Sequence, residues 1–404
     1  MTPMPGVLTV SINNEVFDQI LNLEVTRDLQ NIAGTFRITL VDEARLRNAL
    51  IARIGAGGVN GPVNPGDPVT IAIDGEPVLV GWIDRPRFNW KAGRIACTIV
   101  GRDKTGDLVD CAALPNGPGQ FSGVDLLQVA TLVCAPFGIP VRADVDIGAP
   151  FQRLAKYKHM TALAFLESAA RQRSVLLTSD GIGGLVLTRG GSTRGPAALA
   201  IGENALEIDA EWDWEQRFSD YYVMQDLGYG RIGQPAMNTT TPPAADDGYE
   251  DTIPGSDSVL AEANTGQVGH VADPEITRYR PTVRLTRSQS GVSSVQEQAD
   301  WALRVGKGLA DRVYIDVLEW RAGPGNILWR PNQVVPVWDP YSGIDRDMLI
   351  AGVTFRLTEE GRMTRLRVAG VTAYDRINES DRRRRGKTVS GKVLDSTVTP
   401  LSAS

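Results

Sequence analysis

Hydrophobic and polar residues alternate along most of the first hundred positions. The alternating runs are rich in Val, Ile and Thr, are broken by Gly, Pro and Asp, and cover 7–12, 21–26, 35–41, 69–83 and 93–101. A period of two places successive side chains on opposite faces of a strand, so these runs predict β-strands with one buried face. We therefore expect residues 1–105 to form a barrel-like β domain. A stretch with helical spacing, 44–55, interrupts it.

The hydrophobic period changes after residue 105. Apolar residues recur at helical spacing in 123–139 and in 160–173. Thr161 stands where its side chain can cap the second helix. Two apolar runs separated by a Gly-rich turn then predict a hairpin over 174–191. Residues 106–204 are therefore expected to form a small α+β module.

A third pattern covers residues 206–215, LEIDAEWDWE, where apolar residues and carboxylates alternate strictly. The apolar set, predicted to face a core, is Leu206, Ile208, Ala210, Trp212 and Trp214. The acidic set, predicted to share the opposite face, is Glu207, Asp209, Glu211, Asp213 and Glu215. A catalytic carboxylate pair, a metal site and a surface kept negative are three readings of this row. Neighbouring acids on any such strand meet the spacing of a glycosidase, so spacing alone does not select catalysis.

One β unit occurs twice in the chain. Two stretches align on later ones, 23–37 on 208–222 without gaps and 67–101 on 332–370. The first alignment shares few identical residues, but its polar and apolar positions agree, with Leu23 on Ile208. The second has the same order of strands and turns, and two pairs of glycines mark it, Gly81 with Gly352 and Gly101 with Gly370. The repeat predicts a mainly β fold in which a second barrel-like domain, 205–375, follows the α+β module.

The second copy carries additions. Residues 228–290 are polar, Pro-rich and without a period, which predicts a mobile inserted loop. Helical spacing returns over 293–312, with Ser293 or Ser294 at the start. Residues 376–404 are expected to be a flexible polar and basic tail. Four of its residues are candidates for contact with nucleic acid, anionic lipid or an acidic partner, and solubilisation is the alternative role: Arg382, Arg383, Arg384 and Arg385.

Composition narrows the chemistry. The net charge of −6 argues against a general nucleic-acid binder, and no apolar run reaches the roughly 18 residues of a membrane span. The N-terminus lacks the basic flank and cleavage site of a signal peptide. Only His159 and His270 are present, too few for a His-based triad or a multi-His metal centre, and we expect no cofactor. Three cysteines without CxxC spacing predict reduced thiols: Cys97, Cys111 and Cys134.

Three stretches carry a resemblance to a known family. They are GRDKTGDLVDCAA at 101–113, KYKHMTALAFLESAARQRSVLLTSDGIGGLVLTR at 156–189, and DMLIAGVTFRLTEEGRMTRLRVAG at 347–370. With two β units around an α+β module, the chain resembles the baseplate hub proteins of contractile-tailed bacteriophages, specifically the Mu-like tail proteins. The late-control D proteins and the N-terminal part of type VI secretion spike proteins are wider relatives. The resemblance covers residues 6–375.

This resemblance implies a structural protein of the virion, not an enzyme. Three chains would close into a ring of six nearly equivalent β units, which joins the hexameric tail tube to the trimeric spike. Wedge and tape-measure proteins are further expected partners. The ring would be assembled in the host bacterial cytoplasm, and DNA would pass through its channel without specific binding. The acids of 207–215 would then line the channel and repel phosphates.

Two rival readings remain open. In the first, the protein is a tail-associated cell-wall hydrolase that uses the acids of 207–215. Exchange of Glu for Gln in that range would then abolish lysis while assembly survives. In the second, the same fold serves a secretion or gene-transfer particle, where a hub does the same mechanical work.

Overall fold

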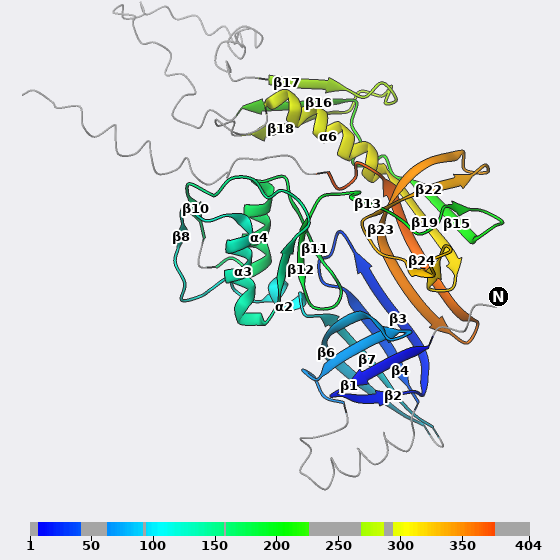
Figure 1. Cartoon of the computed structure of the whole chain (residues 1–404). Coiled ribbons are helices and arrows are strands. Elements are labelled where there is room, and N and C mark those ends of the chain that lie inside the picture. The colour runs from blue at the N-terminus through cyan, green and yellow to red at the C-terminus, as the bar shows by residue number, and fades with distance from the viewer. Residues whose placement is uncertain are drawn as a thin grey trace, which may run out of the picture. The chain divides into compact units, whose positions relative to one another are not determined.

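The computed structural model describes residues 7–41, 63–91, 94–156, 159–225, 268–286 and 294–375. The predicted helix at 44–55 and the tail 376–404 lie outside these ranges. The chain divides into two compact units. The larger unit contains a 14-stranded sheet and the α+β module, and the smaller unit contains the described residues between 218 and 303. Strands dominate, as the alternating pattern predicts (Figure 1).

The first half of the large sheet comes from residues 8–103. From the middle of the sheet outward, its strands are β3 (Ile20–Asp28), β4 (Thr35–Leu40), β7 (Arg94–Asp103), β6 (Glu76–Lys91), β5 (Pro68–Ile73), β1 (Leu8–Ile12) and β2 (Glu15–Phe17). Neighbouring strands are antiparallel. Phe36, Ile38 and Leu40 of β4 are buried while the residues between them are not, because only one face of the strand meets the core.

The second half repeats this strand order with later residues. Its strands are β15 (Ala205–Trp212), β19 (Asp311–Leu318), β24 (Gly361–Gly370), β23 (Ile344–Thr358) and β22 (Gln333–Asp339). Two short strands, β13 (Thr193–Arg194) and β14 (Leu199–Ala200), add to β22 in parallel, and β20 (Arg321–Ala322) pairs with β21 (Ile327–Leu328). β15, β19, β24, β23 and β22 occupy the places of β3, β4, β7, β6 and β5. The predicted duplication of one β unit is therefore confirmed.

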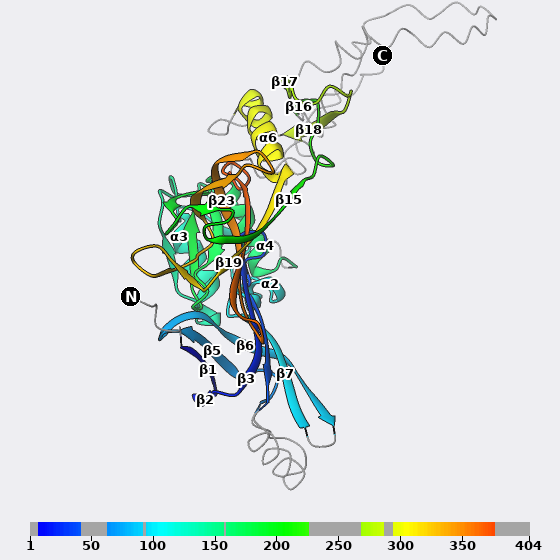
Figure 2. The same ribbon diagram turned by 90° about the vertical axis from the view of Figure 1, so that its right-hand side faces the viewer.

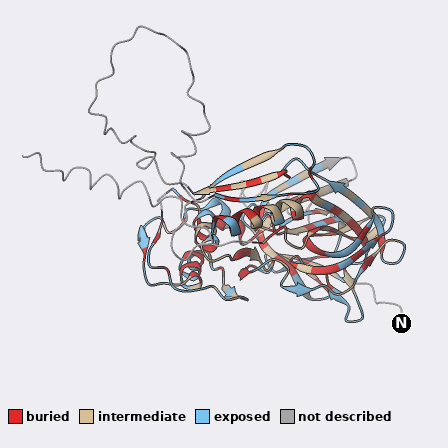
Figure 3. Cartoon of the chain, turned by 90° about the horizontal axis from the view of Figure 1, so that it is seen from above, coloured by how far each residue is buried: buried red, intermediate tan, exposed pale blue. Residues whose placement is uncertain are grey.

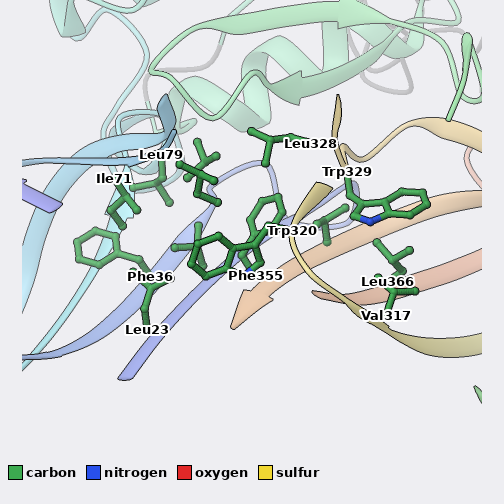
Figure 4. Close-up of a cluster of buried hydrophobic side chains, with 14 of the residues drawn as sticks. Leu23, Phe36, Ile71, Leu79, Val317, Trp320, Leu328, Trp329, Phe355 and Leu366 are labelled. Atoms are coloured by element: carbon green, nitrogen blue, oxygen red, sulfur yellow. The ribbon is translucent and has the colours of Figure 1, made fainter. Parts of the chain in front are cut away.

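Strands β23 and β3 join the two halves into one continuous sheet (Figure 2). They pair antiparallel, and Gly352 lies opposite Asp28 at one end of the pairing. We call this pairing the internal seam. Side chains from both halves contribute to one hydrophobic core. Figure 4 shows Phe36 of the first half near Phe355 of the second, with Trp320 of the second half in the same cluster. The two β units are therefore packed as one body.

The α+β module follows the predicted period. Helix α3 (Leu126–Cys134) runs into the short 3-10 helix η1 (Ala135–Phe137), which Gly138 ends at a φ of 64°. Thr161 caps the next helix as predicted, since its Oγ1 accepts a hydrogen bond from the Ala164 N–H at 3.2 Å. The remaining elements are α2 (Gly106–Asp110), α4 (Ala162–Arg171), β8 (Gln120–Phe121), β9 (Val141–Ala143), β10 (Leu154–Ala155) and the predicted hairpin of β11 (Leu176–Ser179) and β12 (Leu185–Thr188).

The smaller unit contains a three-stranded sheet and the start of a helix. β16 (Asp220–Gln225) pairs antiparallel with β17 (Val268–Ala272) and parallel with β18 (Pro281–Thr286). Helix α6 (Val295–Ala310) begins here, where Ser294 and Glu297 cap each other's backbone N–H. The expectation of one irregular loop over 228–290 is wrong for 268–286. The two strands there are short and interrupted by glycine and proline, which hid their alternation, while 228–267 lies outside the described residues.

Candidate assembly surface

Buried and more exposed residues alternate along strands of the large sheet (Figure 3), because one face packs on the core. The other face is polar. Adjacent strands place paired residues on the same face, so side chains form rows across the sheet. One row is Glu207, Asp316, Arg365, Thr354 and Thr26, and the next is Asp209, Tyr314, Arg367, Gly352 and Asp28. We call the surface that carries these rows the polar face. It runs from β15 across the second half of the sheet and onto β3 of the first half.

Strand β15 is an edge strand, so its apolar residues are less buried than its sequence predicts. β19 pairs with one side of β15, and no strand among the described residues pairs with the other. Trp212 and Trp214, predicted to be core residues, are 49% and 44% exposed, because the described residues cover the hydrophobic side of β15 less fully than that of the inner strands. Leu206 is 51% exposed, and the pairing with β19 shifts between Ala205 and Glu207. The prediction that the apolar set is buried is therefore wrong at these three residues.

The acidic residues are divided by their contacts. Asp213 Oδ2 lies 2.7 Å from the Arg312 guanidinium. Glu207, Asp209 and Glu211 are exposed and form no ion pair within the part of the chain that the structure describes. Glu215 is exposed too and lies beyond the end of β15. The five acids therefore do not act as one group, although the first three share one face of the strand.

An arginine on β24, two strands from β15, moderates the negative charge. Arg365 donates two hydrogen bonds to Asp316, at 2.8 and 2.6 Å. These bonds raise the pKa of Arg365, and the nearby charges of Glu207 and Asp209 add to the effect. Acids and arginines therefore share the polar face, and the row of carboxylates on β15 is not an isolated patch of one sign.

A forked ion pair ties the internal seam. Arg367 on β24 donates to both carboxylate oxygens of Asp28 on β3, at 2.6 to 3.0 Å, and to the Tyr374 hydroxyl at 2.9 Å. The pair crosses over Gly352 on β23, where an added Cβ would lie 2.6 Å from an Asp28 oxygen. Glycine is therefore required here for close approach, because a side chain would push the carboxylate away from the arginine.

The GRDKTGDLV motif forms the joint between the first β unit and the α+β module. Asp103 is buried and accepts hydrogen bonds from Gly34 N–H at 3.0 Å, Ser179 Oγ at 2.6 Å, and both the N–H and Oγ1 of Thr105. Burial raises the pKa of Asp103, and these bonds oppose that effect. Its charge also opposes the burial that lowers the pKa of Arg27 to about 10. The motif is therefore a structural joint in this chain.

The other candidate groups show no reactive arrangement. His270 Nε2 lies 2.9 Å from Asp220 and its ring stacks on Tyr222, within the small sheet, while His159 is exposed in the module. The three cysteines are free, and burial raises the pKa of the Cys97 and Cys134 thiols to about 12. No cluster of potential metal ligands occurs among the described residues. No helix in those ranges has the length and apolar character to cross a bilayer.

The sequence did not reveal a second open edge on β6 or the two arginines that it exposes. Residues 84–91 of β6 extend past β5, so β7 is their one neighbouring strand among the described residues. Arg85 and Arg87 are exposed on this second open edge. Their alternation with Pro86 and Phe88 was the available signal. The tail candidates Arg382 to Arg385 lie outside the described residues.

Comparisons with known proteins agree with this architecture. Three family models match successive parts of the chain: the N-terminal domain of Mu phage baseplate assembly protein GpP-like proteins at 7–103, the second domain of baseplate hub protein gp44-like proteins at 105–189, and the fourth domain of GpP at 291–376. The baseplate hub protein gp44 of Escherichia phage Mu is 30% identical over 98% of this chain and 96% of its own length. The chain belongs to the Mu-like baseplate hub family.

Solved structures support this assignment of the hub protein. The 43 kDa tail protein of prophage MuSo2 from Shewanella oneidensis has a TM-score of 0.70 and 28% identity, over 92% of this chain and all of that one. An Escherichia coli component of the type VI secretion system shares the fold at a TM-score of 0.51 and 8% identity, over 92% of this chain and 80% of that one. The resemblance predicted from the sequence, and the wider similarity of fold to type VI proteins, are therefore confirmed.

Proposed function

We propose that this baseplate hub protein works as a homotrimeric ring of six nearly equivalent β units, which joins a hexameric tail tube to a trimeric spike. One observation carries the proposal: the two halves of the sheet have the same strand order and lie side by side in one sheet. A duplicated unit in a three-fold ring presents six similar positions on one side and keeps three-fold symmetry on the other. That combination joins two different symmetries.

The polar face supplies a wall for a channel. Its rows run from β15 across the second half of the sheet to β3, and they carry acids together with paired arginines. A wall with both signs gives a passing DNA no continuous basic track on which to bind. We therefore place Glu207, Asp209 and Glu211 at the channel, while Asp213, already paired with Arg312, adds less to its charge.

The virion baseplate is the proposed location, after assembly in the host cytoplasm. Tail tube and spike proteins are the proposed direct partners, and wedge and tape-measure proteins are further ones. Arg382 to Arg385 remain proposed contacts for one of these proteins. Deletion from Asp381 is expected to leave a folded ring and to weaken binding of a spike or another partner. Unchanged assembly of the truncated chain would remove that role.

The ring is tested by the mass of the purified full chain. Light scattering across a range of concentrations is expected to show a trimer, or an approach to one, and electron-microscopic class averages are expected to show six similar lobes. A monomer at every concentration, with no ring after addition of the tail tube and spike proteins, would contradict the proposal.

A cell-wall hydrolase is the alternative function. The relatives named above are structural hub proteins, and the acids of 207–215 lie on an open strand where no described residue supplies the opposite wall of a cleft. We therefore propose that the chain is not an enzyme. Exchange of Glu207, Glu211 and Glu215 for Gln is expected to leave any cell-wall hydrolysis by whole particles unchanged, whereas its abolition in intact particles would support the hydrolase.

A further inference from the structure

The two halves of the sheet can be aligned residue by residue from their pairing. Each half contains a long strand with a bulge, where one extra residue has no partner on the next strand. The extra residue is Asp84 where β6 pairs with β7, and Ala351 where β23 pairs with β24. Superposition of these two irregularities makes Arg87 equivalent to Thr354 and Phe88 equivalent to Phe355. Burial supports the match. It makes Val69 of β5 equivalent to Val335 of β22, and both side chains are fully buried.

The same pairings, followed in the other direction, align β3 with β15. Thr26 becomes equivalent to Glu211 and Val25 to Ala210. This is the register that the alternating pattern predicts when Leu23 is aligned on Ile208. Two independent routes, pattern and strand pairing, therefore give one alignment of the first strands.

The internal seam shows how these strands pair when they meet. Thr354 lies opposite Thr26 and Phe355 opposite Val25. The two threonine Oγ1 atoms are 3.0 Å apart, so residues at this pair of positions touch on the polar face. Phe355 and Val25 are 1% and 0% exposed, because each strand covers the hydrophobic side of the other.

Strand β6, the equivalent of β23, and strand β15, the equivalent of β3, each have an open edge in the described part of the sheet. Residues 84–91 of β6 and residues 207–212 of β15 each have one neighbouring strand in the described ranges. Phe88 and Ala210 are only partly buried, although they contact the same hydrophobic core. Unpaired edges with half-covered apolar residues are sites where a further strand adds.

We propose that residues 85–89 of β6 pair antiparallel with residues 209–213 of a second copy, the end of β15 and the residue after it, with Arg87 opposite Glu211. This external seam reproduces the register of the internal seam. The other pairs it creates are Arg85 with Asp213, Pro86 with Trp212, Phe88 with Ala210 and Asn89 with Asp209. The inference rests on the proposed ring and specifies its contact between chains.

Charge supports this register independently, because charge was not used to derive it. The β6 edge offers Arg85 and Arg87 on the polar face; opposite Arg87 lies the exposed Glu211, and opposite Arg85 lies Asp213, whose side chain is 12% exposed and already bonded to Arg312. Opposite charges on directly paired residues stabilise an antiparallel pair. At the internal seam an arginine also binds the acid equivalent to Asp213, but it comes from the next strand: Arg367 of β24 reaches Asp28 across Gly352.

The apolar side of the external seam agrees with this pairing. Trp212, 49% exposed in the single chain, comes opposite Pro86, and the two cover the edge of the core between Phe88 and Ala210. Pro86 has no N–H to donate, so the strand ladder lacks at most one hydrogen bond at this position. The acids on β15 therefore have a partner strand to recognise in addition to a channel to line.

A disulfide placed in the predicted register tests the inference directly. Paired residues on antiparallel strands have Cα atoms about 4.5 to 5.5 Å apart, within reach of a disulfide. In a Cys111→Ser background, which removes the exposed native thiol, the full chain with Arg87→Cys and Glu211→Cys is expected to form covalent oligomers under mild oxidation. The matched control, Arg87→Cys with Asp209→Cys, is two residues out of register and is expected to cross-link at least about fivefold less.

Charge exchange gives a second measurement that needs no new bond. Arg87→Glu alone and Glu211→Arg alone are each expected to weaken association about tenfold or more, since like charges would face each other. The double variant is expected to recover most of it. Both residues are exposed in the single chain, so the urea midpoint of the monomer should not move, which separates loss of assembly from loss of folding.

The outcomes separate this inference from the proposed function. A trimeric mass without cross-linking at 87 and 211, or with equal cross-linking in the control, overturns the register and leaves the ring. A monomer at every concentration, without cross-linking even beside the tail tube and spike proteins, overturns both. Selective cross-linking with rescue by the double charge variant supports both.

Discussion

Strands β23 and β6 are copies of one element in two environments. Phe355 of β23 is 1% exposed because β3 pairs alongside, whereas its equivalent Phe88 in β6 is only partly buried. Asp28 meets a forked arginine inside the chain, while its equivalent Asp213 lies at an open edge beside Arg312. The residue at one equivalent position fits its surroundings in each copy. In β23 it is Gly352, over which an ion pair crosses, and in β6 it is Arg85, beside which we expect a strand from another chain. If the proposed ring forms, stability of the chain and association between chains are therefore separable at equivalent positions.

The largest expected effect separates the two phenylalanines. Phe355→Ala should cost about 3–5 kcal/mol of unfolding free energy, because it leaves a cavity in the shared core. Phe88→Ala should cost the single chain only about 1 kcal/mol and should weaken its oligomer instead. Urea unfolding at low protein concentration, beside light scattering at high concentration, measures both quantities. Equal losses of stability in the two variants would contradict the assignment of β6 to an open edge.

The two aspartates give a smaller contrast. Asp28→Ala leaves Arg367, whose side chain is 15% exposed, without its carboxylate, and should cost about 2–3 kcal/mol. Asp213→Ala leaves Arg312, which is 48% exposed and can turn to water, so about 1 kcal/mol or less is expected. Chemical denaturation of the two variants compares them. A larger loss at Asp213 would show that the open edge already carries a stabilising contact.

The joint at Asp103 should respond to both substitution and pH. Asp103→Asn places an amide NH₂ group against a hydrogen-bond donor, and about 2 kcal/mol of stability should be lost. Burial raises the pKa of this carboxyl, so the folded state binds its proton more readily than the unfolded state. Between the ordinary pKa of aspartate and the raised one, its contribution to stability therefore falls as pH rises.

The Asn variant lacks this titration. The difference in unfolding free energy between the natural chain and Asp103→Asn is therefore expected to shrink as pH rises through the raised pKa. Urea midpoints at several pH values provide the measurement, with Asp125→Asn, at an exposed helix cap, as a control for general effects of charge. A difference that grows with pH would mean that hydrogen bonds outweigh burial at Asp103.

The smallest effect on folding is expected at Trp212. Trp212→Ser should change the unfolding free energy of the monomer by only about 0.5 kcal/mol, because half of the side chain is already exposed. Association should nevertheless weaken, since the indole would lose its place opposite Pro86 in the external seam. Sedimentation of the variant across concentrations tests this, and an unchanged association constant would place the indole outside the contact.

Much of the fold could be predicted because its elements follow local rules. Alternation located the strands, Thr161 marked a helix start, and Leu23 aligned correctly on Ile208 without sequence identity. Glycines misled the second alignment: strand pairing makes Arg85, not Gly81, equivalent to Gly352. A glycine here records a close local approach, such as that of Asp28, and such contacts need not be shared by two copies.

The candidate surface was harder to predict, because it depends on which strands lie at an edge. The alternation of β15 predicts an acidic face and an apolar face, but only the strand order shows that β15 lies at an edge, where the described residues leave Trp212 49% exposed. The exposure of Arg85 and Arg87 on an open edge likewise depends on β6 extending past the end of β5. Edge position is a property of the whole sheet, so no window of sequence contains it.

The internal seam affects the equilibrium yield of the proposed ring. At equilibrium, the concentration of a ring of six separate units would vary with the sixth power of the free-unit concentration, whereas the concentration of a ring of three fused pairs varies with the third power of the free-chain concentration. Because β3 and β23 are tethered in one chain, each meets the other at a high effective concentration before any second molecule arrives. In the proposed ring, half of the closures are therefore made during folding, and a dilute pool of newly made chains suffices to begin a tail.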